Sequence, residues 1–395
     1  MTKQHFFLLL LFMAVIASAH PQKLAFTDTT YFFNDKNLIE SVIEYSVENN
    51  DTLKNGNAHF YYITQSLKQS GIYKNDSLYG KWTTYYGNGK IKRIANYYNG
   101  YRNGEVKTFH ENGNIKYQGD FLNDSLTGKM EIFYGTGILM ETRVYVSGKL
   151  NGLTQGYFPN GNRKYIINFT DSIKSGTYQK FYSSGEIKED AHINNTSFYG
   201  DYKTYYENGN VEKEYSYNGY DITGPYLVYH QNGKKKISAF YSSGKPDGLY
   251  QQFHNNGYIY ESGVYKNTMR EGLWNSYYPD STLYMQGRYF HGEAQGVWKI
   301  YYDNGKIKQT GLYDKGVSQG KWMFYFENGQ IRSKGVYIDN KENGHWVHFY
   351  ENGQVKLDLY YKMGDLEGIL TAYDEDGNLL EQAEYSGNKL LHKIK

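Results

Sequence analysis

The chain contains no cysteine, and only 5 of its 395 residues are proline. Without cysteine it forms no disulfide, so its stability comes from packing and strand pairing. It also lacks an excess of one charge, because 43 basic and 41 acidic residues leave a formal net charge of +2. Charges so evenly balanced create no long-range field that would attract nucleic acid or an anionic membrane. We therefore expect no nucleic-acid partner.

Long hydrophobic runs are missing except near the N-terminus, where residues 6–16 are apolar. Lys3 precedes this run and the small residues Ala17, Ser18 and Ala19 follow it, which is typical of a secretory signal peptide. The alternative, a membrane anchor, is disfavoured because the run is too short to cross a bilayer. We predict a signal peptide at 1–19, cleaved near Ala19. The mature chain would be secreted, periplasmic or associated with the cell envelope, without a transmembrane segment.

Tyrosine and glycine are abundant, with 46 and 43 residues, and both favour short strands joined by tight turns. A glycine recurs every 24 residues from Gly80 to Gly368, which defines thirteen units in constant phase. We number each unit from this glycine as position zero. Such periodicity predicts a stack of repeats rather than separate globular domains.

Asn-Gly occupies positions eight and nine in nine of the thirteen units, as at Asn88-Gly89. Asn-Gly between strands predicts a type I′ hairpin turn, because both central residues need positive φ. Residues whose positions add to seventeen then face each other across the hairpin. Position two therefore pairs with position fifteen, position six with position eleven and position zero with position seventeen, all on one core face. Small residues at fifteen, such as Gly311, would leave room for an indole at position two. That position carries every tryptophan of the chain: Trp82, Trp274, Trp298, Trp322 and Trp346.

Position five lies on the opposite face and is aromatic in every unit. Exposed apolar rows on soluble proteins usually mark interaction surfaces. We therefore predict a binding stripe there, unless the sheet coils so strongly that the stripe becomes a second core. The stripe consists of Tyr85, Phe109, Phe133, Tyr157, Phe181, Tyr205, Tyr229, Phe253, Tyr277, Tyr301, Tyr325, Phe349 and Tyr373.

These patterns predict an all-β fold, an elongated single-layer antiparallel β-meander or solenoid of 24-residue β-hairpin repeats at 80–387. Residues 20–79 are expected to form degenerate N-terminal repeats that cap the array. Around residues 35–45 a strand is favoured over a short helix, although the apolar spacing fits both. Residues 388–395 form a polar C-terminal tail.

Strict repetition argues against an enzyme, because catalysis needs unlike residues in one unique geometry. The sequence has none of the common metalloprotease, P-loop or serine-hydrolase motifs. His110, His230 and His254 occupy position six, where a packed histidine is more probable than a metal ligand. Acidic residues recur beside the turns, but calcium needs six or more oxygen ligands. We predict no catalytic residue, no metal and no cofactor.

The pattern Gly-x-Trp-x-x-Tyr-Tyr-x-Asn-Gly-x-Ile-Lys at 80–92 and 296–308 resembles the bacterial variant of the MORN repeat. Proteins with such repeats are often assigned to antitoxin families. The resemblance implies a single-layer β-meander used for protein or lipid association. Two features depart from it: most units lack the Gly-x-Gly ending, so a lipid-binding role does not carry over, and a signal peptide fits poorly with a cytosolic antitoxin.

The most favoured function is a non-catalytic repeat scaffold that binds protein partners along its extended sheet. The first alternative is a cell-wall or glycan-binding module, because regularly spaced aromatics among polar residues suit sugar rings. The second alternative is an antitoxin-like protein that neutralises a toxin. An enzyme is disfavoured, since a repeat array without insertions offers no enclosed pocket.

Overall fold

The computed structural model describes residues 24–48 and 50–395, so the predicted signal peptide lies outside the described residues. Within them the chain forms one open antiparallel sheet of 33 strands, in which strands that follow one another in sequence pair as hairpins. Its one helical element is the short 3-10 turn η1 (Phe32–Asn34). The predicted all-β meander of hairpin repeats is confirmed.

The chain divides into two compact units, residues 1–152 and 153–395. In the first unit, strands β1 to β11 follow in order: β1 Leu24–Tyr31, β2 Ile39–Glu48, β3 Asp51–Tyr61, β4 Leu67–Lys74, β5 Ser77–Tyr85, β6 Ile91–Tyr98, β7 Tyr101–Phe109, β8 Ile115–Leu122, β9 Ser125–Phe133, β10 Leu139–Val146 and β11 Lys149–Leu150. The first two core clusters, around Trp82 and around Val106, belong to this unit.

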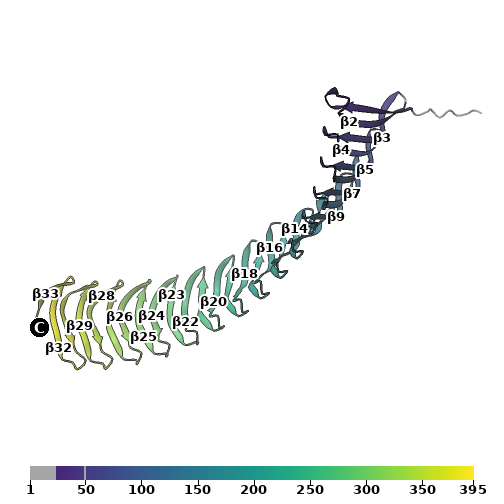
Figure 1. Cartoon of the computed structure of the whole chain (residues 1–395). Coiled ribbons are helices and arrows are strands. Elements are labelled where there is room, and N and C mark those ends of the chain that lie inside the picture. The colour runs from purple at the N-terminus through teal and green to yellow at the C-terminus, as the bar shows by residue number, and fades with distance from the viewer. Residues whose placement is uncertain (1–23, 49) are drawn as a thin grey trace, which may run out of the picture. The chain divides into compact units, whose positions relative to one another are not determined.

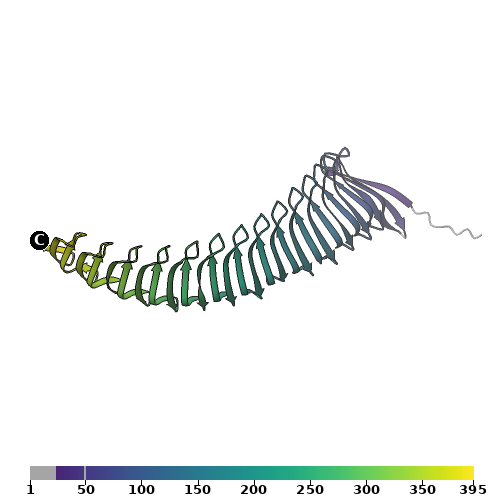
Figure 2. The ribbon, with the colours of Figure 1, turned by 90° about the horizontal axis from the view of Figure 1, so that it is seen from below.

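The second unit continues the same pattern, and its strands lie side by side in sequence order (Figure 1). Figure 2 shows its hairpin loops following one another along the edge of the ribbon. The strands are β12 Gly152–Tyr157, which begins at the boundary, β13 Arg163–Thr170, β14 Ile173–Phe181, β15 Ile187–Asn194, β16 Ser197–Tyr205, β17 Val211–Asn218, β18 Asp221–Tyr229, β19 Lys235–Ser242, β20 Lys245–Phe253, β21 Ile259–Lys266, β22 Met269–Tyr277, β23 Leu283–Phe290, β24 Glu293–Tyr301, β25 Ile307–Asp314, β26 Val317–Tyr325, β27 Ile331–Ile338, β28 Lys341–Phe349, β29 Val355–Lys362, β30 Asp365–Leu366, β31 Gly368–Tyr373, β32 Leu379–Ser386 and β33 Lys389–Lys393.

The expected register holds for most of each hairpin but fails next to the turn. Gly296 pairs with Tyr313 and Trp298 with Gly311, as the rule of seventeen predicts. The register then shifts, and Tyr301 at position five pairs with Ile307 at position eleven. The predicted pairing of six with eleven is therefore wrong, because the residue at position twelve is extra and forms a β-bulge.

The predicted type I′ turn at Asn-Gly is also wrong. Tyr302 N donates to Lys306 O at 2.8 Å, and Gly305 N donates to Tyr302 O at 3.0 Å. Gly305 has φ +79°, whereas Asn304 does not adopt positive φ. This is a three-residue loop, a type I turn followed by a left-handed glycine. Paired positive φ values occur instead in the turns between repeats, as at Asn99 (+47°) and Gly100 (+84°).

The recurring glycine at position zero has a conformational role. All thirteen of these glycines adopt positive φ, from +64° at Gly200 to +129° at Gly248. The ladder to the preceding hairpin is interrupted here, so that Leu312 pairs with Gln319 while Thr310 pairs with Met323. A residue with a side chain would be strained at such a bulge, which explains why the position is constant.

The tryptophans obtain their space from the preceding repeat, not from the hairpin partner that we expected. Trp346 pairs with Leu359, yet its indole lies over Gly335. The same relationship holds for all five, each eleven residues after a glycine: Gly71 and Trp82, Gly263 and Trp274, Gly287 and Trp298, Gly311 and Trp322, Gly335 and Trp346. Four of the five indoles thereby link successive repeats of the second unit. A separate core cluster of the same unit lies around Tyr178.

The strand alternative for the N-terminal segment is confirmed, because β2 spans Ile39–Glu48 and pairs with β1 and β3. The hairpin β3–β4 closes with the same loop as the regular repeats even without Asn-Gly, and Gln65 there has φ +63°. At the other end, the segment expected to be a polar tail contributes β33, an exposed strand paired with β32. In the described residues, no helix has the length and apolar character needed to cross a membrane.

Candidate binding surface

We call the sheet face that carries the tryptophans the front face and the opposite one the back face. Because side chains alternate along a strand, positions one, three and five of each repeat lie on the back face. Their cross-strand partners at sixteen, fourteen and eleven lie there too, as the pairs Val297 with Leu312 and Lys299 with Thr310 show. The front face is largely occupied by packed rings, so the back face is where a partner finds accessible side chains.

The predicted binding stripe at position five is only half-accessible, because all thirteen of its aromatics are half-buried. In most hairpins whose register is described, the ring lies across the ladder from an aliphatic residue at position eleven, as with Tyr325 and Ile331. The repeat of Gly224 is an exception, because Tyr229 pairs with Lys235. Polar neighbours on the same face contact some of the hydroxyls, for example Tyr157 Oη and Gln155 Oε1 at 3.1 Å. The bulge at position twelve thus places the stripe residues where they pack partly against position eleven within the sheet. Whether it also contacts a partner stays a prediction.

Position six forms a ladder between repeats along the turn edge. Tyr302 Oη donates to Tyr325 O of the next repeat at 2.7 Å. Lys308, at position twelve, lies over the Tyr302 ring with its Nζ 5.4 Å from the centroid. The same Tyr–Lys arrangement recurs at Tyr182 with Lys188. These contacts connect adjacent turns and explain why the slot is aromatic.

The three histidines at position six take part in this ladder. Their Nε2 atoms lie 3.3, 3.4 and 3.0 Å from the carbonyl oxygens of Phe133, Phe253 and Tyr277, respectively. An imidazole N–H donates in place of the tyrosine hydroxyl. In residues 24–48 and 50–395, no three His, Cys, Asp or Glu side chains gather closely enough to hold a metal ion.

Exposed apolar residues of the back face lie at positions one and sixteen, which sequence reasoning had not singled out. Val297 is 59 % exposed and Leu249 is 56 % exposed. We call the apolar row the set Phe240, Leu249, Val264, Leu273, Val297 and Leu312 on β19 to β25. At positions one, three, fourteen and sixteen, this stretch carries two charged residues, Arg288 and Lys299. An exposed apolar row with a polar border is characteristic of an interaction surface.

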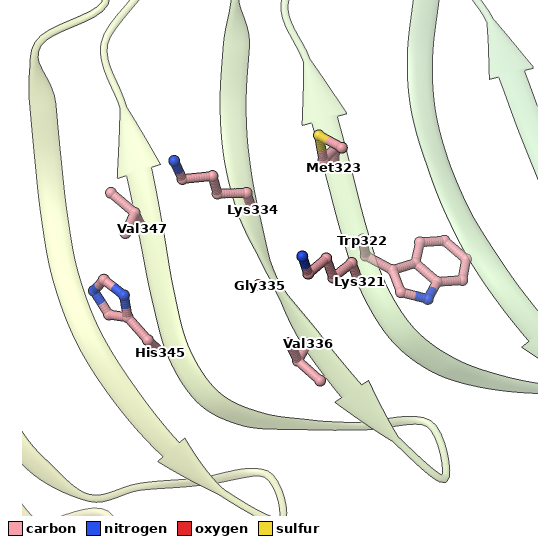
Figure 3. A pocket seen from close by; sticks show the side chains of 8 residues that line it. All are labelled: Lys321, Trp322, Met323, Lys334, Gly335, Val336, His345 and Val347. Atoms are coloured by element: carbon pink, nitrogen blue, oxygen red, sulfur yellow. The ribbon is translucent and has the colours of Figure 1, made fainter.

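Next to the apolar row lies a basic hollow of about 330 Å³ on β26, β27 and β28. Met323, Val336 and Val347 provide its apolar lining, while Lys321, Lys334 and His345 surround it (Figure 3). Within the described chain, neither lysine takes part in an ion pair. Lys334 instead lies over the ring of Phe349, with its Nζ 5.4 Å from the centroid. The hollow therefore offers two unneutralised ammonium groups beside apolar side chains.

His345 is fixed at the border of this hollow. Its Nε2 donates to Asp358 Oδ1 at 2.7 Å, and its ring stacks on Tyr360 with the centroids 4.9 Å apart. The sequence did carry a signal for this site. Counting position one, position fourteen and position one of the next unit, only the unit starting at Gly320 has basic residues at all three.

Perturbed ionisation occurs mainly on the front face. Burial raises the pKa of Tyr202 and Tyr215, whose rings stack with centroids 5.2 Å apart. Burial also raises the pKa of Glu342 and lowers that of His348, where Arg332 and Lys356 add to the effect. The Glu141 carboxylate holds the pKa of Arg143 well above its usual value. These shifts follow from packing of the front face and lie outside the basic hollow.

The fold and this surface define a class of protein, a β-hairpin repeat protein with one packed and one open sheet face. The MORN repeat variant model matches eight segments of the chain, and the chain belongs to that family. The segments are 78–99, 102–123, 150–171, 198–218, 294–315, 318–339, 342–363 and 366–386. Residues 219–293 are not matched, yet they form strands β18 to β23 in the same phase.

No curated protein sequence matches the chain. Among solved structures, the chain is similar to "TcdB2-TccC3 without hypervariable C-terminal region", with 10% identity and a TM-score of 0.15. It is also similar to "TcdB2-TccC3", with 12% identity and a TM-score of 0.16. The alignments cover 87% and 93% of this chain but 22% and 28% of those chains, so this chain spans about a quarter of their length. Similarity at this level carries no argument about function.

Proposed function

We propose that the chain is an exported, non-catalytic repeat scaffold that binds protein through the back face of its second unit. The apolar row on β19 to β25 supports this proposal, because its side chains are exposed on a sheet whose other face is packed. Burying apolar side chains against a partner stabilises a complex by about 25 cal/mol per Å². The basic hollow beside the row adds charged groups that orient a partner.

The absence of catalysis is part of the proposal and rests on the form of the hollow. It is a shallow depression on a sheet, whereas enzymes generally act in enclosed sites with converging polar groups. Its histidine already donates to Asp358 and stacks on Tyr360. The side chains around it are suited to holding an acidic surface beside apolar contacts.

A capture experiment tests the proposal. The protein would be secreted by its own cells and recovered from the envelope together with whatever it binds. The captured material would then be separated into a protein fraction and a polysaccharide fraction. Leu249→Asp with Val297→Asp should abolish protein capture. Tyr258→Asp is the matched control, because Tyr258 is 56 % exposed but lies in a turn, outside the back face. Capture by polysaccharide alone would favour the glycan-binding alternative and overturn the proposal.

Export is tested separately by sequencing the N-terminus of the recovered protein. Cleavage after Ala19 would leave a mature chain beginning at His20. A recovered protein that still begins at Met1 would contradict the signal peptide, although it would leave the binding surface untouched.

A further inference from the structure

The back face of the second unit changes in chemical character along the sheet. Acidic residues lie on β15 to β17, the apolar row follows on β19 to β25, and the basic hollow lies on β26 to β28. All three regions occupy the same set of positions in their repeats, namely one, fourteen and sixteen, with the exception of the hollow's lining at position three. They therefore form one continuous band with opposite charges at its two ends.

The acidic end consists of Asp190, Asp201 and Glu214. Asp201 is exposed and accepts a hydrogen bond from Ser216 Oγ at 2.7 Å. Asp190 accepts from Gln179 Nε2 at 3.1 Å, which leaves its charge in place. Glu214 pairs with Lys203 at 3.0 Å, but both side chains remain more than a third exposed. Three carboxylates thus face one ammonium group, so this end keeps a negative charge.

The two charged ends are placed symmetrically about the apolar row. Asp201 and Glu214 belong to the repeat of Gly200, and Lys321 and Lys334 belong to the repeat of Gly320. The point midway between these repeats falls between the repeats of Gly248 and Gly272, which is inside the apolar row. A band of this kind is complementary to a reversed copy of itself.

We propose that a second copy of the chain packs against this band, back face to back face, with its repeats running in the opposite direction. The repeat of Gly200 then lies over the partner's basic repeat, and the repeats around Gly248 and Gly272 lie over each other at the centre. This two-fold arrangement makes every contact twice, which is characteristic of isologous dimers. The proposal rests on the scaffold function above and names the partner.

A second copy fits better than an unrelated protein because it has the same spacing. Equivalent residues in successive repeats are separated by two strands, about 10 Å along the sheet. A partner with the same twist and repeat keeps its side chains in step over several units, and twisted sheets do pack face to face. A parallel arrangement is disfavoured, because it would place acidic ends together and basic ends together.

Arg288 and Lys299 are the two charged residues at positions one, three, fourteen and sixteen within the stretch of the apolar row. In the reversed arrangement, Arg288 falls over the repeat of Gly248 and Lys299 over the repeat of Gly224. Both have long aliphatic stems that can cover apolar side chains while the charged group stays at the border in water. They are therefore compatible with the packing, and their charges do not oppose each other.

Charge reversal tests the proposal on the full mature chain by sedimentation equilibrium. The wild type should be a dimer. Lys321→Glu with Lys334→Glu makes both ends acidic, and Asp201→Lys with Glu214→Lys makes both ends basic. The dissociation constant of each double variant's homodimer should be at least about 100-fold higher than that of the wild type, which corresponds to about 2.8 kcal/mol. Because the substitutions are at solvent-accessible back-face positions, circular dichroism should show unchanged folding.

Mixing the two variants provides the decisive measurement. The acidic variant and the basic variant should form a heterodimer with each other, and combining all four substitutions in one chain should restore the homodimer. A monomeric wild type, or variants that do not recover on mixing, would overturn the second copy as partner. The capture experiment would still test the scaffold function independently. If the back face binds protein of any kind, the variant with Leu249→Asp and Val297→Asp should not capture protein.

Discussion

The indole of Trp322 lies so close to Gly311 of the preceding repeat that no side chain fits between them. A Cβ placed on Gly311 would lie 2.0 Å from Trp322 Cδ2, although Gly311 itself has an ordinary extended φ. The contact joins residues eleven apart on different hairpins. It therefore couples one repeat to the next, where the cross-strand pair within a hairpin does not.

Replacing Gly311 by alanine should lower the free energy of unfolding of the surrounding repeats by about 1–3 kcal/mol, because overpacking displaces the indole. In a Trp322→Val background the same replacement should cost almost nothing. The natural pair Ala95 and Val106 occupies the equivalent positions and is nearly fully buried. A double-mutant cycle in urea measures the coupling. Equal costs in both backgrounds would show that the close contact does not limit packing.

The two glycines of one turn should respond differently to alanine. Gly89 has φ +80°, whereas Gly87 lacks positive φ, and a Cβ on either meets no atom within 4 Å. Gly89→Ala should therefore destabilise the turn by about 1–2 kcal/mol, the cost of a left-handed residue with a side chain. Gly87→Ala serves as the control and should be neutral or slightly stabilising. Hydrogen exchange should show the loss near β5 and β6 while distant repeats stay protected.

The aromatic stripe should contribute to stability. Replacing Tyr277, Tyr301 and Tyr325 together by serine removes half-buried rings that lie opposite aliphatic residues. We expect a loss of about 1 kcal/mol or more per ring. Val297→Ser, at a more exposed position of the same face, should cost much less. If the triple variant keeps full stability in chemical denaturation, the rings are not packed and become candidates for partner contact again.

Acid should lower the stability of the repeat of Gly344 through His348. Burial lowers the pKa of this histidine from 6.5, and Arg332 and Lys356 add to the effect. Because the folded state binds this proton less readily than the unfolded chain, stability is complete above about pH 6.5 and declines as the pH falls through the folded pKa. Hydrogen exchange of β28 and β29 between pH 7.5 and pH 5 measures this. His348→Phe, matching Phe324 in the preceding repeat, should reduce the pH dependence. An unchanged pH profile in that variant would exclude His348 as its source.

The sequence was sufficient to predict the strands, their phase and most of the register. Glycine at position zero recurs strictly and every tryptophan lies at position two, and the hairpin arithmetic then placed Trp298 opposite Gly311. The turn class was predicted wrongly, because Asn-Gly suits both a type I′ turn and a type I turn that ends in a left-handed glycine. The choice depends on the bulge at position twelve, which adds one residue to the second strand.

The candidate surface was harder to predict than the fold. Position five seemed exposed because it alternates away from the tryptophans, but the bulge brings it opposite position eleven, as Tyr301 lies opposite Ile307. Residues at positions one and sixteen vary in kind from repeat to repeat, so periodicity alone gives them no signal. Leu249 and Val297 become informative only when their exposure and their neighbours on adjacent hairpins are known.

The pairing of position fifteen with position two of the next unit also decides where this chain can be cut and rejoined. A 24-residue module that starts and ends inside hairpin loops carries each glycine together with the tryptophan that covers it. A module cut at the position-zero glycines separates these partners, so that a large ring can meet an alanine or a leucine across the junction. Recombination of such arrays should therefore favour breakpoints in the Asn-Gly loops. A repeat duplicated between two such breakpoints keeps each glycine together with the tryptophan that packs over it.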